Sequence, residues 1–101
     1  MQQGPQLKSN PRAVGAAAHT GGKHERALAL YAGGQFESAA ELLRQALLEA
    51  PSSELANDMG AVELACGRRE QALAQFFLAI SLDPENVEAV ANLGTLLARA
   101  I

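Results

Sequence analysis

The helix-breaking residues of this chain recur at a fixed interval of 33 residues. Gly34 recurs as Gly67, and Pro51 recurs as Pro84. Glycine ends a helix readily because it adopts the left-handed conformation without a Cβ penalty, and proline stops a helix because it lacks the backbone N–H. A repeat of about 20–50 residues is typical of stacked structural units. The interval therefore predicts two copies of one helix–turn–helix unit.

The segments between these breaks carry apolar residues at helical spacing. Residues three and four apart lie on one face of a helix, so each stripe predicts an amphipathic helix. The clearest stripes are Leu42, Leu43, Ala46, Leu47 and Ala50; Leu55, Met59, Val62 and Cys66; and Leu73, Phe76, Phe77 and Ile80. Aromatic residues make up only 4% of the chain, which favours close-packed helices over a β-sandwich. We therefore predict an all-α fold with five helices.

The first 22 residues differ from the rest of the chain. They hold repeated Gly, Pro and Ala, no acidic residue, and only Lys8 and Arg12 as charges. Without periodic apolar positions such a segment has nothing to bury. We expect a flexible Gly/Pro/Ala-rich tail over 1–22 and a folded domain over 23–101.

Residues of matching size recur at the same interval. The pairs are Ala39 with Ala72, Ala46 with Ala79, Leu43 with Phe76, and Leu47 with Ile80. Small residues belong where two helices approach closely, and we expect the same of Gly60 and Gly94. A helical hairpin of this kind cannot bury its apolar faces alone. We therefore expect the hairpins to stack on one another as a solenoid.

The second hairpin resembles a tetratricopeptide repeat (TPR). The matching residues are Gly60, Gly67, Ala72, Phe76, Ala79 and Pro84, and in the first copy Ala27, Gly34, Phe36, Ala39, Leu43, Ala46 and Pro51. The family's tryptophan and tyrosine positions are Ala56 and Glu63 in the second copy, so the match is incomplete. The resemblance implies a right-handed solenoid of helical hairpins, with repeat one over 20–52, repeat two over 53–86 and a half repeat over 87–101.

The resemblance also implies a binding surface. In this family the first helix of each hairpin lines a concave groove that binds a peptide or a partner's helix. The corresponding positions here are His24, Leu28, Tyr31, Asn57, Asp58, Ala61, Leu64, Glu88, Asn92, Thr95 and Arg99. The alternative interpretation is that they form the ordinary polar faces of surface helices.

Charge in the groove predicts the kind of partner. Chaperone-binding members of the family clamp a terminal carboxylate with lysine, arginine and asparagine. Here the equivalent positions are His24, Leu28, Asp58, Asn92 and Glu88, of which only Asn92 retains any of that chemistry. The acidic residues Asp58 and Glu88, together with Glu54, favour a basic or mixed protein or peptide partner over an acidic one.

Several other function classes are not supported. The net charge of −3 provides no basic field for nucleic acid or an anionic membrane. One cysteine, Cys66, excludes an internal disulfide and favours the reducing cytoplasm. We expect Cys66 to be a buried structural thiol, and His19 and His24 to be solvated rather than metal ligands. We predict no enzyme, cofactor or metal.

The last predicted helix carries two apolar stripes. One consists of Ala89, Leu93, Leu96 and Ala100, and the other of Val87, Val90, Leu97 and Ile101, with Gly94 between its members. One stripe can pack on the second hairpin, whereas the other requires a further helix. Three explanations stay open. In the first, the chain is a fragment of a longer protein, and the resemblance allows that protein to be a larger enzyme such as a glycosyltransferase. In the second, the chain forms a homodimer through this helix. In the third, a partner supplies the missing helix. The alternative function is therefore a self-associating structural module.

Overall fold

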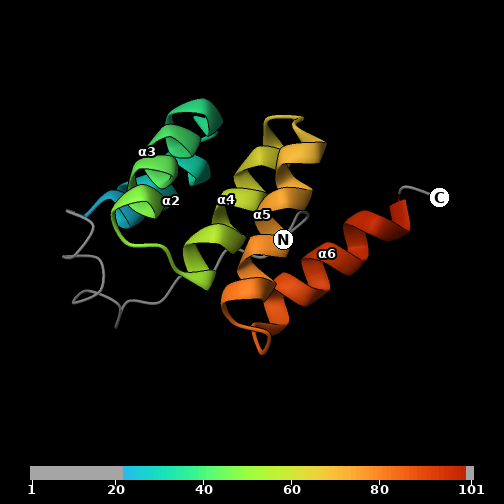
Figure 1. Ribbon diagram of the computed structural model, residues 1–101. Helices are drawn as coiled ribbons and strands as arrows, with labels where there is room; N and C mark the ends of the chain where they lie inside the picture. Colours follow the sequence, from blue (N-terminus) through green and yellow to red (C-terminus); the bar gives the residue numbers. More distant parts are fainter. Residues whose placement is uncertain (1–21, 100–101) are drawn as a thin grey trace.

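The computed structural model describes residues 22–99 as five α-helices joined by short turns (Figure 1). The helices are α2 (Lys23–Ala32), α3 (Phe36–Glu49), α4 (Ser53–Ala65), α5 (Arg69–Leu82) and α6 (Val87–Arg99). The described part of the chain contains no strand, which confirms the predicted all-α class. None of these helices has both the length and the apolar character needed to cross a membrane. The tail predicted over 1–22, except Gly22, lies outside the described residues, and so does Ile101.

Both glycine turns close in the same way. Gly34 and Gly67 have φ angles of 84° and 82°, the left-handed region predicted for them. At the first turn the Gln35 amide donates to the carbonyl of Leu30 at 2.8 Å, and the Gly34 amide donates to that of Tyr31 at 3.0 Å. The equivalent two hydrogen bonds close the turn at Gly67. This pairing is the Schellman arrangement, which satisfies the last carbonyls of a helix and reverses the chain.

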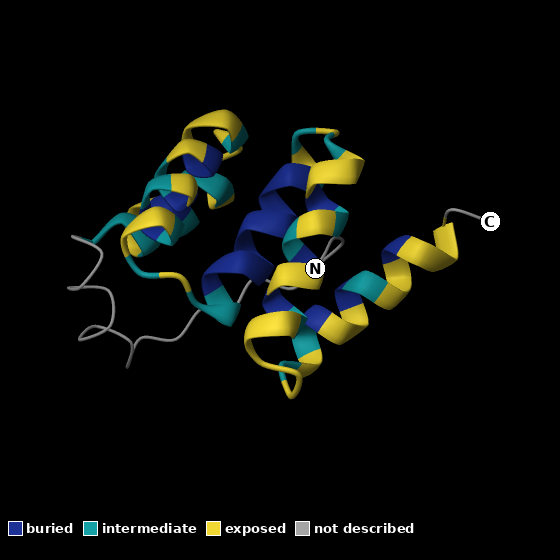
Figure 2. Ribbon diagram, in the orientation of Figure 1, coloured by how far each residue is buried: buried dark blue, intermediate teal, exposed yellow. Residues whose placement is uncertain are grey.

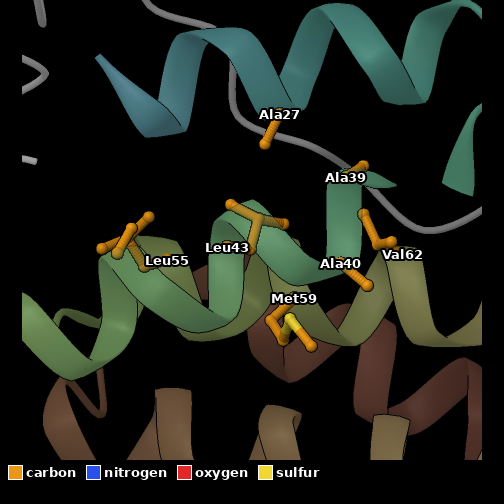
Figure 3. Packing of buried hydrophobic residues seen from close by; sticks show 8 residues of the cluster. Ala27, Ala39, Ala40, Leu43, Leu55, Met59 and Val62 are labelled. Carbon is orange, nitrogen blue, oxygen red and sulfur yellow. The ribbon is translucent and has the colours of Figure 1, made fainter. Parts of the chain in front are cut away.

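Helices adjacent in sequence pack against each other throughout the described residues. The hairpin α2–α3 packs on α4, α4 pairs with α5, and α5 packs on α6. Figure 3 shows the first core, built by small residues on α2 and α3 facing larger ones on α3 and α4. Its buried members are Ala27, Ala39, Ala40, Leu43, Ala46, Leu55, Met59 and Val62. The arrangement is one of adjacent helical hairpins.

Helix α4 is the most buried element of the fold. Every residue from Leu55 to Glu63 is buried, and Figure 2 shows this helix dark blue over most of its length. Its burial on both sides follows from its position between α3 and α5. The other helices each bury one face only, as the amphipathic stripes predicted.

The tightest contact between helices joins α4 to α5. A Cβ atom placed on Gly60 would lie 2.5 Å from Cε1 of Phe76, whose ring has no exposed surface. Gly60 therefore lets these helices approach, as predicted. The same prediction for Gly94 is wrong, because a Cβ atom there would meet nothing within 4 Å.

The last helix confirms its two predicted stripes within the described residues. Ala89 and Leu96 are buried against α5, and Leu93 is partly buried. Val90 and Leu97 on the other stripe are 48% and 46% exposed, and Val87 is 75% exposed.

Candidate functional site

A pocket of about 580 Å³ lies between the first turns of α4 and α6. The end of α5 and the turn that follows it complete its wall. The lining residues are Pro51, Ser52, Ser53, Glu54, Leu82, Asp83, Glu85, Asn86, Val87 and Glu88. Two of the acids singled out from the sequence, Glu54 and Glu88, therefore lie in one pocket.

Hydroxyl and amide side chains fix the shape of this pocket. The Ser52 hydroxyl caps α4 by accepting from the Leu55 amide at 3.0 Å, and the Asn86 side-chain oxygen caps α6 by accepting from the Ala89 amide at 3.1 Å. The other end of the Asn86 side chain donates to the Ser53 hydroxyl at 2.8 Å.

The Ser53 hydroxyl in turn donates to the carbonyl of Ala79 on α5 at 2.7 Å. This chain of hydrogen bonds ties the start of α4, the end of α5 and the start of α6 together. Because the bonds from Asn86 to Ser53 and from Ser53 to Ala79 join different elements, the pocket has a defined geometry rather than being a loose gap between surface loops.

The pocket is strongly acidic. Its ten described lining residues include four carboxylates, on Glu54, Asp83, Glu85 and Glu88, and no basic side chain. Two helix N-termini also meet there, each equivalent to roughly half a positive charge. Four full negative charges outweigh these partial charges, so the pocket attracts cations.

An ion pair borders the pocket on the side of α2. His24 Nε2 lies 2.7 Å from Oδ2 of Asp58, whose side chain has no exposed surface. This hydrogen bond raises the pKa of His24 above its ordinary value, against the opposing effect of burial. The charge of Glu54 acts in the same direction. The pair joins α2 to α4 across one repeat length.

The same residues form the cluster best able to hold a metal among residues 22–99. One ligand atom each from His24, Glu54 and Asp58 lies within 4.8 Å of the others. The 2.7 Å separation of His24 and Asp58 is that of a hydrogen bond, whereas two ligands of one Zn²⁺ ion, each about 2.0–2.2 Å from the metal, stand farther apart. The geometry favours a shared proton over a bound cation.

A second polar pair joins α4 to α6. The Asn92 side-chain amide donates to Oδ1 of Asn57 at 2.9 Å, and both residues are buried. Together with His24 and Asp58, these residues were predicted to contact a partner. The structure brings them together in pairs, His24 of α2 with Asp58 of α4 and Asn57 of α4 with Asn92 of α6.

The remaining predicted groove residues differ in exposure. Ala61 is fully buried, whereas Leu28, Leu64 and Glu88 are half-buried, and Thr95 and Arg99 are exposed. Tyr31 is also half-buried, and its ring centroid lies 5.4 Å from that of Phe36. Burial raises the pKa of the Tyr31 hydroxyl.

The cysteine lies away from the pocket, beside a charged cluster. Arg68 donates to Glu63 at 2.5 Å and to Glu37 at 2.8 Å, linking α3 to α4. Its hydrogen bond lowers the pKa of Glu37. Cys66 is partly rather than fully buried, which corrects the prediction, and burial raises the pKa of its thiol. A raised pKa disfavours the reactive thiolate.

Sequence reasoning missed the turn that completes the pocket. Asp83, Glu85 and Asn86 were not among the predicted site residues, although serine and asparagine before an apolar stripe are typical helix N-caps. The paired polar residues carried a signal as well, because His24 and Asp58 are separated by 34 residues and Asn57 and Asn92 by 35. Polar side chains one repeat apart on stacked helices are placed to meet.

No protein-family model matches this chain, and no curated protein matches it. The resemblance to tetratricopeptide repeats therefore stays a prediction from the sequence.

Proposed function

We propose that this chain is a non-catalytic protein–protein interaction module that binds a basic segment of a partner in the pocket between α4 and α6. The observation that carries the proposal is the collection of four carboxylates around one pocket without a basic lining residue. The polar network of Ser52, Ser53 and Asn86 supports it, because a preorganised pocket costs less to order on binding.

The pocket has the chemistry that a lysine or arginine side chain requires. Pro51, Leu82 and Val87 provide apolar wall for the aliphatic stem, and the carboxylates surround the charged head. An acidic segment would be repelled by the same charges. The half-buried Glu88 and the exposed Thr95 and Arg99 extend the surface from the pocket along α6.

We further propose that the hairpins form a right-handed solenoid of the tetratricopeptide type. Support comes from the two identical glycine turns and from the polar pairs one repeat apart on α2, α4 and α6. The single cysteine fits our proposal that the protein acts in the reducing cytoplasm.

Binding of a labelled basic peptide tests the function. The probe is a capped, fluorescein-labelled peptide of alternating Leu and Lys, measured by fluorescence anisotropy against its Leu–Glu counterpart. We expect saturable binding of the basic peptide only. Glu88→Lys should weaken it about tenfold or more, because an attraction of up to about 1 kcal/mol becomes a repulsion of similar size.

Glu70→Lys is the matched control. Glu70 and Glu88 are both acidic residues in the first turn of a helix, but only Glu88 lines the pocket. The two variants have the same net charge, so general attraction of the peptide falls equally in both. Equal weakening by both substitutions, or equal binding of the acidic peptide, would refute the proposal.

A second candidate function is association through α6. The exposed Val87, Val90 and Leu97 favour it, because contiguous exposed apolar side chains typically mark an interface. This candidate shares Val87 with the wall of the acidic pocket, whereas Val90 and Leu97 lie outside the pocket lining.

A further inference from the structure

The acidic pocket has a histidine beside one of its walls. Glu54, which lines the pocket, and Asp58 are four residues apart on α4, so their side chains lie on one face of that helix. Asp58 is the buried carboxylate that His24 of α2 contacts at 2.7 Å. One oxygen of Glu54 lies within 4.8 Å of both the His24 ring nitrogen and the Asp58 oxygen. A pocket carboxylate therefore stands within electrostatic reach of a histidine that does not itself line the pocket.

The wall formed by α6 has a different neighbour. Glu88 lines the pocket there, and the residue four positions later is Asn92, whose side-chain amide donates to Asn57 at 2.9 Å. Asparagine does not titrate, whereas histidine changes its charge between about pH 5 and pH 8. Among the residues that the structure describes, only the α4 side of the pocket therefore has a histidine beside a lining carboxylate.

The surroundings of His24 favour its protonated form. The charged groups that act on it are Asp58 and Glu54 of α4 and Glu25 of its own helix, and its neighbour Lys23 is paired with Glu49 of α3 at 2.9 Å. The hydrogen bond to Asp58 is the main cause of the raised pKa of His24, and the three carboxylates add to it. Below about pH 6.5 the imidazole is therefore mostly a cation.

A cation beside Glu54 opposes the ligand that the pocket attracts. A lysine or arginine head in contact with Glu54, at about 3 Å, would stand on the order of 8 Å or less from the His24 ring. Two like charges at that distance repel each other, and salt screens the repulsion only in part. When His24 loses its proton the repulsion ends, while the negative charge of buried Asp58 is retained.

We infer that His24 makes the acidic pocket pH-sensitive, so that protonation of its imidazole weakens binding of a basic segment and deprotonation strengthens it; this rests on the proposed function of the pocket. The affinity should rise roughly three- to tenfold from pH 5.5 to pH 8.5. The coupling is reciprocal, because a bound cation disfavours the protonated imidazole. Binding therefore lowers the pKa of His24 and releases a proton in the pH range in which His24 titrates.

Isothermal titration calorimetry of the full chain tests this coupling. The probe is the capped peptide of alternating Leu and Lys without its label, titrated at steps from pH 5.5 to pH 8.5 at constant ionic strength. Buffers of different ionisation enthalpy report the protons released on binding. His24→Gln should remove both the rise in affinity and the proton release. His19→Gln is the matched control, because His19 is the other of the two histidines in the sequence, and it should retain both effects.

NMR titration of the His24 ring in the parent chain does not depend on a histidine variant that folds. Saturating peptide should lower the pKa of His24. Without peptide, Glu54→Gln should lower it as well, because a carboxylate that favours the protonated imidazole is removed. Glu70→Gln in the first turn of α5 is the matched control and should leave the His24 pKa unchanged, because Glu70 is outside the His24 cluster.

The outcomes separate this inference from the proposed function. Affinity that rises with pH in the parent and in His19→Gln, but not in His24→Gln, supports it. Binding of equal affinity at every pH, a rise that His24→Gln retains, or a His24 pKa unchanged by peptide or by Glu54→Gln overturns the pH coupling and leaves the pocket as the binding site. Absence of binding at every pH refutes the proposed function, and the coupling with it.

Discussion

The contact between Gly60 and Phe76 gives the sharpest prediction of stability. In Gly60→Ala the new Cβ atom would stand 2.5, 2.7 and 2.8 Å from three carbons of the Phe76 ring. Carbon atoms prefer about 3.5–4.0 Å, so the ring or the helix must retreat by roughly 1 Å. Phe76 is fully buried and packs with Ala72 and Leu96, which leaves it no open space to move into.

Two opposing effects set the magnitude. Overpacking of a close-packed core costs about 1–3 kcal/mol, while replacing glycine by alanine inside a helix stabilises it by about 1 kcal/mol. The steric effect should prevail at Gly60 because all three close atoms belong to a ring held on every side. We expect a net loss of about 1–2 kcal/mol, which lowers the Tm of a domain of this size by roughly 4–16 °C.

Thermal unfolding followed by circular dichroism measures this effect, with Gly94→Ala as the matched control. Gly94 lies 34 residues after Gly60 and also stands in the middle of a helix, but a Cβ atom there would meet nothing within 4 Å. The same substitution there should stabilise the fold by about 0.5–1 kcal/mol. If the same substitution lowers the Tm at Gly60 and raises it at Gly94, the difference is due to the contact with Phe76. A Tm for Gly60→Ala equal to or above that of the parent would refute the reasoning.

Two further substitutions test the ion pair and the packing between α4 and α5. His24→Gln removes a charge-assisted hydrogen bond to buried Asp58, worth about 1.5–3 kcal/mol. The pKa of His24 is raised on folding, so this stabilisation is present below about pH 6.5 and is lost as the pH rises through the folded-state pKa. Urea unfolding should therefore show a larger loss of unfolding free energy in His24→Gln at low pH than at high pH. A loss that does not change with pH would count against the ion pair. Ala72→Phe should lower stability by about 1–3 kcal/mol because Ala72 is fully buried, and an unchanged thermal midpoint would contradict that.

The architecture could be predicted from the sequence because its signals are local. Gly34 and Gly67 mark turns through backbone conformation alone, and Pro51 and Pro84 mark helix ends through a missing donor. The stripes on α6 likewise follow from helical spacing. These features need no knowledge of which helix packs where.

The candidate site was only partly predictable because it depends on contacts between helices. The acids Glu54 and Glu88 were identified from their positions, but the pocket also needs Asn86 to reach Ser53 across the turn. Gly94 shows the reverse case. Its sequence context is that of Gly60, and the absence of a close neighbour within the described residues follows only from which helix stands opposite it.

Chemical-shift mapping of the whole chain tests the proposed function most directly. The ¹⁵N-labelled protein is titrated with the alternating Leu–Lys peptide, and the amide resonances are followed by NMR. We predict saturable shifts concentrated at Ser53, Glu54, Asn86 and Glu88 around the pocket, with Leu97 unaffected. Shifts distributed over the acidic surface in general, or centred on the outer face of α6, would contradict the assignment of this pocket as the binding site.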